Sequence, residues 1–359
     1  MERIQNKITF VDMSKGDIET IKQKAEKEIS EIASLQEKLL NLNKKNFDDV
    51  NSFIQSSVFI RNKHGLTRLI CSIESAYNSR PLITSLLLSL FDEKILKSIK
   101  DFFSDEEISH IINNHAILNF FHEKGFTRVP EIESHSQIVD AINNDPFIKS
   151  IREDNLSEFQ NLIKPNHKLI DQEIKNIVPE EIDFIKIHVL HAYPIEASAY
   201  FGSVQIFKYL FHEKVTSLKS PKLKYHAIAG GNMEIINLVS SIEGNKYDGD
   251  CLEIAIKFQR NEIIPFLEKQ NLKFTIHSLF NCIRNYNLII FGHIIESILF
   301  DASFDMKQIN EKEKGESIVQ MVSRTGFSEF MGLLVSLKSI DLSSKGEVFC
   351  CKLKMEFVK

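Results

Sequence analysis

Two histidines, His188 and His191, have side chains that could act as metal ligands. Imidazole nitrogens are common zinc ligands, and residues three apart share one face if their segment is helical. No cluster of acidic residues or cysteines accompanies this pair, and other histidines, such as His110 and His115, are scattered along the chain. We therefore expect surface or core roles for these histidines and no metal site.

The cysteines do not form a recognisable redox or metal motif. There are five of them, an odd number, and none belongs to a C-x-x-C pair: Cys71, Cys251, Cys282, Cys350 and Cys351. Such a set does not read as a disulfide framework and fits a reduced, intracellular setting. The adjacent Cys350 and Cys351 lie near the C-terminus, where a frayed tail is expected rather than a reactive site.

Sequence patterns of known catalytic and nucleotide-binding sites do not occur. The chain lacks a G-x-G-x-x-G or Walker loop, an H-E-x-x-H motif, a G-x-S-x-G motif and the kinase motifs. Its carboxylates are mixed with lysines on expected helix faces, which is typical of solvated surfaces. We therefore predict that the protein is not an enzyme and uses no cofactor. An enzyme with its site in the N-terminal helical region remains the alternative.

Charge and hydropathy exclude two other classes of protein. The 359 residues include 44 Lys and Arg against 49 Asp and Glu, a net charge of −5, whereas nucleic-acid binders carry a basic stripe. The longest apolar runs, Pro81 to Phe91 and Leu288 to Phe300, are shorter than the ~20 residues of a membrane span. The charged start MERIQNKITF lacks the apolar core of a secretion signal. We expect no nucleic acid partner, no membrane span and a cytoplasmic location.

The segment from Pro194 to Val239 contains one pattern twice. The copies are PIEASAYFGSVQIFKYL and LKYHAIAGGNMEIINLV. Each predicts a short helix with small residues on its inner face, a glycine that ends it, and a second helix with an apolar stripe. Gly202 and Gly231 are the reference positions, since glycine readily takes the positive φ of a helix C-terminus.

The same register continues along the chain. Gln259, Tyr286 and Gly326 occupy the reference position in later copies, and Asn155 occupies it in a weaker, earlier copy. Cys282 then stands where Ala227 and Ala255 stand, so we expect it to be a packing residue. The copies recur at short intervals (231 − 202 = 29), and a longer one (326 − 286 = 40) contains a polar, loop-like insertion at about 301–316. Self-similarity at such a period predicts a helical solenoid.

The unit resembles the ankyrin repeat. YPIEASAYFGSVQIFKYL follows the pattern TPLH-x-A-A-x-x-G-x-x-x-I-V-x-x-L, with Pro194, Ala199, Gly202 and Leu210 in matching places. Only this copy has the proline, none has the full TPLH, and the repeats are shorter than the ~33 residues of ankyrin. The short form is similar to the divergent ankyrin-type domain of large protist ankyrin-repeat families, in which an all-helical region precedes the repeats. The resemblance covers about residues 187–339.

The resemblance also implies where a partner would bind. In ankyrin proteins, variable contact positions lie on the fingers between helix pairs and just before the reference glycine. Two places before the reference, this sequence has Ala229 in one copy and four larger residues in the others: Tyr200, Lys257, Arg284 and Arg324. Tyrosine and arginine are common anchors of protein interfaces, and the basic residues would suit an acidic partner segment. The alternative is that these are simply the exposed ends of the first helices.

A long amphipathic helix is predicted over 17–43. Seven of eight heptad a and d places are apolar, with Glu28 as the exception: Ile18, Ile21, Ala25, Ile32, Leu35, Leu39 and Leu42. This seam could join two copies of the chain as a coiled coil, or it could pack on the protein's own helical domain. We favour packing on the protein's own domain, because Glu28 interrupts the seam and few heptads exist.

The region between this helix and the repeats reads as helical throughout. Ser104 with Glu107 forms a capping-box pattern, and Asn144-Asp145-Pro146 marks a boundary. The expected helices are Phe47–Ile60, Gly65–Asn78, Leu82–Phe91, Glu93–Phe103, Asp105–Lys124 and His135–Asn143, with a further helix near Ile170–Ile177.

The sequence thus predicts an all-α protein in three parts. An N-terminal helical domain (1–145) precedes five to six ankyrin-like repeats (146–345) and a C-terminal tail (346–359). The predicted function is non-catalytic binding of a protein partner, as an intracellular scaffold or adaptor. The alternative is a self-associating structural protein that forms a homo-oligomer through the seam at 18–42.

Overall fold

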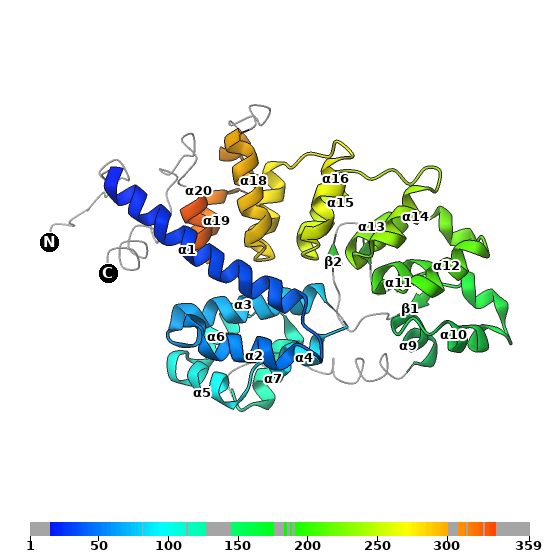
Figure 1. The fold of residues 1–359 in the computed structure, drawn as a ribbon, viewed down its shortest axis with the longest axis horizontal. Helices are drawn as coiled ribbons and strands as arrows, with labels where there is room; N and C mark the ends of the chain where they lie inside the picture. The colour runs from blue at the N-terminus through cyan, green and yellow to red at the C-terminus, as the bar shows by residue number, and fades with distance from the viewer. Residues whose placement is uncertain are drawn as a thin grey trace. The chain divides into compact units, whose positions relative to one another are not determined.

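The computed structural model shows an all-α protein with a few two-residue strands (Figure 1). It describes residues 15–80, 82–112, 114–126, 145–175, 183–184, 187–188, 191–300, 308–313, 315–325 and 327–334. The chain forms two compact units: 38–273, and 274–359 together with 1–37. The expected helix at 135–143, Gly326, Cys350, Cys351 and the tail at 346–359 lie outside the described residues.

The long helix α1 spans Lys15–Leu40. Of the predicted seam, the part with described side chains is buried within the chain: Ile32, Leu35, Leu39 and Leu42 are at most 3% exposed. These residues pack inside the protein, as the intramolecular interpretation of the stripe expects, and are not presented to a second copy.

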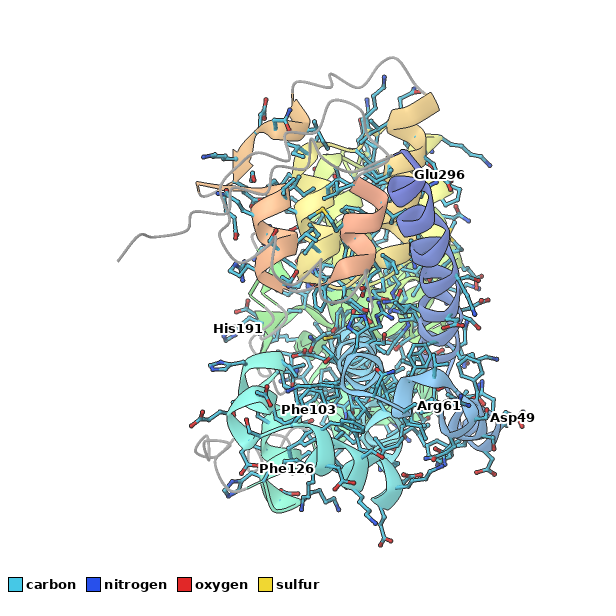
Figure 2. All side chains as sticks on the ribbon, turned by 90° about the vertical axis from the view of Figure 1, so that its left-hand side faces the viewer. Asp49, Arg61, Phe103, Phe126, His191 and Glu296 are labelled. Carbon is cyan, nitrogen blue, oxygen red and sulfur yellow. The ribbon has the colours of Figure 1, made fainter. Side chains whose placement is uncertain are left out.

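Six helices follow in the N-terminal part of the larger unit. They are α2 (Phe47–Ser56), α3 (Lys63–Ser79), α4 (Thr84–Ser89), α5 (Glu93–Phe102), α6 (Asp105–Ile111) and α7 (His115–Glu123), with a 3-10 turn, η2 (Val58–Ile60). The predicted capping box of Ser104 and Glu107 is present at α6. Figure 2 shows Phe103 and Phe126 among these helices, where they are 7% and 1% exposed, and Asp49 and Arg61 at their outer edge.

The prediction of one helix over 105–124 is wrong, because Asn114 starts a new helix. Its side-chain oxygen accepts a hydrogen bond from Ile117 N at 3.0 Å, which is the bond of an N-cap. Its own N–H donates to Glu74 Oε1 at 2.6 Å, and its amide donates to Asn78 Oδ1 at 2.7 Å. These bonds to α3 fix the break between α6 and α7.

Helix pairs follow in the rest of the larger unit and stack in chain order (Figure 1). The first helices pack side by side, α11 on α9 and α13, and α13 on α15, while α12 packs on α10 and α14. Asp145 and Pro146 begin the first pair, as predicted. The elements are α9 (Pro146–Arg152), α10 (Leu156–Ile163), η3 (His167–Asp171), α11 (Pro194–Phe201), α12 (Val204–His212), η4 (Thr216–Lys219), α13 (Leu223–Gly230), α14 (Met233–Ser240), α15 (Gly249–Lys257), η5 (Asn261–Ile263) and α16 (Ile264–Glu268).

The first helices meet through small residues. Ala199, Ala227 and Ala255 are fully buried, and so is Cys282 at the equivalent place in the smaller unit. At the end of α13 the approach is closest, since a Cβ on Gly230 would overlap the carbonyl oxygen of Ala199. The predicted packing role of the small residues is therefore confirmed.

The reference positions adopt the left-handed conformation. The φ angles are +74° at Gly202, +81° at Gly231, +48° at Gln259 and +49° at Tyr286. The predicted register is therefore confirmed, even at the two positions that are not glycine. In the first pair the prediction is off by one residue, because Asp154 has φ +52° and Asn155 is the N-cap of α10.

The left-handed residue Gln259 is held by the N-terminal helices of the same unit. The guanidinium of Arg80 donates to the carbonyl oxygens of Phe258 at 2.8 Å and Gln259 at 3.2 Å. The Gln259 amide donates to the hydroxyl of Ser75. A cation at the C-terminal end of α15 also interacts favourably with the helix dipole.

Short strands replace a predicted helix between α10 and α11. We expected a helix near 170–177, but η3 ends at Asp171 and strand β1 (Ile174–Lys175) pairs with β4 (His191–Ala192). Strands β2 (Asp183–Phe184) and β3 (Ile187–His188) pair with each other. At the end of η3, the Asp171 carboxylate accepts the N–H groups of Thr216 at 3.0 Å and Ser217 at 3.2 Å and so caps the start of η4.

The smaller unit repeats the same organisation. It contains α17 (Ile276–Arg284), α18 (Leu288–Phe300), η6 (Gln308–Asn310), β5 (Lys312–Glu313), β6 (Glu316–Ser317), α19 (Ile318–Thr325) and α20 (Ser328–Leu334). Helix α1 belongs to this unit as far as Glu37, and Gln36 Nε2 donates to the carbonyl oxygen of the left-handed Tyr286 at 2.5 Å. The insertion predicted as a loop at 301–316 contains a helical turn and a two-stranded hairpin in its described part.

The close approach at Gly230 predicts the sign of the stability change that Gly230→Ala causes. Helix propensity alone would make Gly230→Ala stabilising by up to about 1 kcal/mol. The overlap with the Ala199 carbonyl should instead destabilise the protein by about 1–3 kcal/mol, as overpacking does. Chemical denaturation followed by circular dichroism measures the difference. Gly249→Ala is the matched control, since no atom lies within 4 Å of its Cβ position, and it should be neutral or slightly stabilising.

A second prediction concerns Arg80. Burial, helped by the nearby charge of Arg260, lowers the pKa of Arg80 to about 9, so the side chain stays charged at neutral pH. Arg80→Met keeps the apolar stem but leaves two buried carbonyls without their charged donor. We expect a loss of about 1.5–3 kcal/mol in the free energy of unfolding. Arg61→Met, at an exposed arginine, should change it by less than about 0.5 kcal/mol. Equal effects of the two substitutions would contradict the proposed role.

Candidate functional site

Of the four predicted contact residues, the structure buries Tyr200, half-buries Lys257 and exposes Arg284 and Arg324. Tyr200 in α11 is only 3% exposed, and its ring meets those of Phe201 at 5.3 Å and Phe258 at 6.0 Å. The expectation that Tyr200 is a surface anchor is therefore wrong, because aromatic rings from its own helix and from the end of α15 enclose it. Lys257 is half-buried, with its ammonium 6.0 Å from the Phe258 ring.

Arg284, the last residue of α17, is exposed and already holds a carboxylate. Its Nη2 lies 2.9 Å from Oε1 of Glu313 in strand β5. The Nδ1 atom of His277, on the same helix, lies 3.3 Å from the same oxygen. The other guanidinium nitrogen, Nη1, donates to Asn281 Oδ1 at 3.1 Å. Two side chains of α17 thus converge on one carboxylate oxygen.

Arg324 makes an equivalent contact near the end of α19. Its Nε and Nη2 donate to the two carboxylate oxygens of Glu316 at 3.0 and 3.2 Å. This fork geometry is the strong form of an ion pair, and the hydrogen bond to Glu316 raises the pKa of Arg324. Within the smaller unit α19 packs on α17, so the hairpin contacts an arginine from each of two neighbouring first helices.

The hairpin places its two glutamates opposite each other. Glu313 in β5 pairs in register with Glu316 in β6, and like charges on directly opposed residues repel. The two arginines offset this repulsion. We name Glu313, Glu316, His277, Arg284 and Arg324 the carboxylate clamp.

Sequence reasoning missed both glutamates of the clamp. They lie in the insertion that the sequence predicted as a loop, within the run E-K-G-E. Gly315 has φ +84°, and two-residue hairpin turns favour glycine because they need positive φ. That signal could have predicted the turn, although the arginine partners follow only from the fold.

A second group of titratable side chains joins α13 to α15. The Asp248 carboxylate accepts from Lys224 Nζ at 2.7 Å and from the Tyr225 hydroxyl at 2.8 Å, and Cys251 Sγ lies 3.5 Å from its other oxygen. A nucleophilic cysteine must be a thiolate, but burial raises the pKa of Cys251 to about 12. The group therefore acts as a structural link between two helix pairs.

The two candidate metal-ligating histidines do not share a helix face. His188 lies in strand β3 and His191 in strand β4, each paired to a different strand. Because both residues lie in strands, the three-residue spacing does not place them on one helix face. Across the described residues, no group of three or more His, Cys, Asp or Glu side chains is arranged to hold a metal ion.

Comparison with known proteins gives one match. Residues 216–294, from the 3-10 turn η4 into α18, match a family described as a domain of unknown function (DUF3447). No curated protein and no solved structure matches the chain. In the part of the chain that the structure describes, we find no helix with both the length and the apolar character that crossing a membrane requires.

The link at Asp248 gives a pH-dependent prediction. Burial alone would raise the pKa of Asp248, but the hydrogen bonds from Lys224 and Tyr225 outweigh it and lower the pKa. A carboxylate with a lowered pKa stabilises the folded state above its unfolded pKa of about 3.9, and this contribution is lost as the pH falls through the folded pKa.

We therefore expect Asp248→Asn to be destabilising at pH 7, by less than about 1 kcal/mol because the carboxylate is partly exposed. The difference from the unsubstituted protein should shrink as the pH falls below about 4. Denaturation curves measured across this range provide the test, with Asp49→Asn at an exposed position of α2 as the control. A difference that is constant over the whole range would rule out the charge as its cause.

Proposed function

We propose that the protein is a non-catalytic binding module, which engages a protein partner through ankyrin-like repeats as a scaffold or adaptor in the cytoplasm. The observation that carries the proposal is the pairing of Arg284 and Arg324 with the carboxylates of Glu313 and Glu316. These arginines stand at equivalent positions near the ends of α17 and α19.

The position of the two arginines alone is not evidence that they bind a partner. A cation near a helix C-terminus is favoured by the helix dipole whether or not it binds anything. The carboxylate geometry adds the specific support, because it shows side chains that are oriented to hold acidic groups. Guanidinium groups that are partly exposed and already oriented lose little freedom when they bind a carboxylate.

Other features of the chain are consistent with this proposal. Stacked helix pairs of the ankyrin type offer an extended surface on which contacts are spread over several repeats. Lys257 occupies the same position, at the end of α15. The titratable group at Asp248 is explained by packing and leaves no nucleophile at neutral pH.

The proposal predicts that charge reversal at these positions abolishes partner binding. The test is an affinity capture from a lysate of the cells that produce the protein. It compares the unsubstituted chain with a triple variant carrying Lys257→Glu, Arg284→Glu and Arg324→Glu. Tyr200 is left intact because it is a core residue. We expect a partner to be retained by the unsubstituted protein and lost by the variant.

A charge-matched control separates the surface from the overall charge. Lys164→Glu, Lys219→Glu and Lys269→Glu change the same net charge at exposed positions elsewhere. Circular dichroism must show that both variants are folded. A partner captured equally by all three proteins would contradict the assignment of binding to these repeat positions.

A further inference from the structure

One face of α17 has the arrangement of a small carboxylate-binding site. His277, Asn281 and Arg284 are spaced i, i+4 and i+7, so their side chains leave the same side of the helix. Asn281 orients the guanidinium through its bond to Nη1 at 3.1 Å, and the guanidinium lies 5.7 Å from the Phe280 ring centroid. Nη2 of Arg284 and Nδ1 of His277 lie 2.9 and 3.3 Å from one oxygen of Glu313.

Glu313 is an imperfect occupant of this site. Its Oε1 lies beside nitrogen atoms of both Arg284 and His277, but its Oε2 is buried and has no hydrogen-bond partner. A buried acceptor without a partner is costly. Glu313 also faces the like charge of Glu316 across the hairpin. The hairpin has only two residues in each strand, and an isolated two-stranded hairpin is marginally stable at best.

The two ends of the hairpin are held differently. Glu316 lies two residues before α19, and Ser317 and Gln320 form reciprocal bonds at 2.8 and 3.2 Å across the helix start. Its bidentate pair with Arg324 adds to this anchor. Glu313 has no comparable helix next to it. Release of the hairpin would therefore begin at Glu313 and expose Arg284 and His277 while Glu316 stays in place.

We propose that the α17 face formed by His277, Asn281 and Arg284 binds a glutamate or aspartate side chain of an acidic peptide segment, and that Glu313 occupies this site in the free protein. The inference rests on the proposed binding function and names the chemistry of its partner. His277 and Arg284 are 43% and 34% exposed, so the site is at the surface, where an extended peptide can lie across it.

Occupation by Glu313 lowers the apparent affinity for a partner. A peptide can bind only those molecules in which Glu313 has left the site. Its apparent dissociation constant is therefore the intrinsic one divided by the fraction of such molecules. Removing the Glu313 charge should therefore increase binding of an acidic peptide. The free energy of an ion pair that is exposed to this degree corresponds to a change of about fivefold in the dissociation constant of the peptide.

The test uses the full chain and a fluorescently labelled oligoglutamate peptide, with oligoglutamine as the neutral probe. Fluorescence anisotropy should show that Glu313→Gln binds oligoglutamate about fivefold more tightly than the unsubstituted protein does. Adding Arg284→Gln to this variant should abolish the gain. In the unsubstituted protein, saturating peptide should accelerate hydrogen exchange of the Lys312 and Glu313 amides.

Glu311→Gln is the matched control. Glu311 is exposed, lies two residues before Glu313, and its substitution changes the net charge equally. It should leave oligoglutamate binding unchanged. Equal gains from both substitutions would mean that net charge governs binding, and persistence of binding after Arg284→Gln would place it elsewhere. Either result overturns the inference.

The outcome is separable from that of the proposed function. One outcome is that the triple charge-reversal variant loses the partner, while Glu313→Gln and Arg284→Gln do not change its capture. This result would support the proposed function and reject this site. Oligoglutamate binding that depends on Glu313 and Arg284 would support the site even if the triple variant retained its cellular partner.

Discussion

The close approach of first helices is the constraint on which the stacked pairs depend. Where α13 meets α11, the backbone of Gly230 lies against the Ala199 carbonyl, with no room for a Cβ. Ala199, Ala227 and Ala255, one on each of three successive first helices, are fully buried. The chain must then reverse within one residue to start the second helix, which requires a left-handed residue. Small inner faces and left-handed ends are therefore two consequences of a single packing geometry.

Among the described ends of first helices, three left-handed residues are not glycine, Asp154, Gln259 and Tyr286, and in each the side chain ties elements together. Asp154 accepts the N–H groups of Gln205 at 3.1 Å and Ile206 at 3.0 Å, and so caps the next pair's second helix. Gln259 donates to Ser75, and the hydroxyl of Tyr286 donates to the buried carboxylate of Glu329. The left-handed conformation costs a non-glycine residue about 1–2 kcal/mol. A buried hydrogen bond recovers about 1 kcal/mol, so side-chain contacts offset much of the strain.

Features that follow from the local spacing of residues could be predicted from the sequence. Features that depend on tertiary contacts could not. The offsets around Gly202 and Gly231 located Gln259 and Tyr286 because helix ends recur with the repeat. Tyr200 has the same offset as Arg284, yet it is buried, since its exposure depends on Phe258, far along the chain. The break at Asn114 likewise depends on Glu74 in α3. Arg284 and Arg324 were predicted as contact positions, but Glu313 and Glu316 were not, because an ion pair across an insertion leaves no periodic signal.

The inserted segment lies where its hairpin can contact the ends of two first helices. Lengthening a surface connection costs little, since loop-closure entropy grows slowly with length. Each described helix pair packs mainly on its neighbours in the chain, so an inserted hairpin need not disturb the stack. What it adds is two carboxylates that meet arginines from two successive first helices. Those helix ends would otherwise be open basic positions, so the insertion makes access to them conditional on its own displacement.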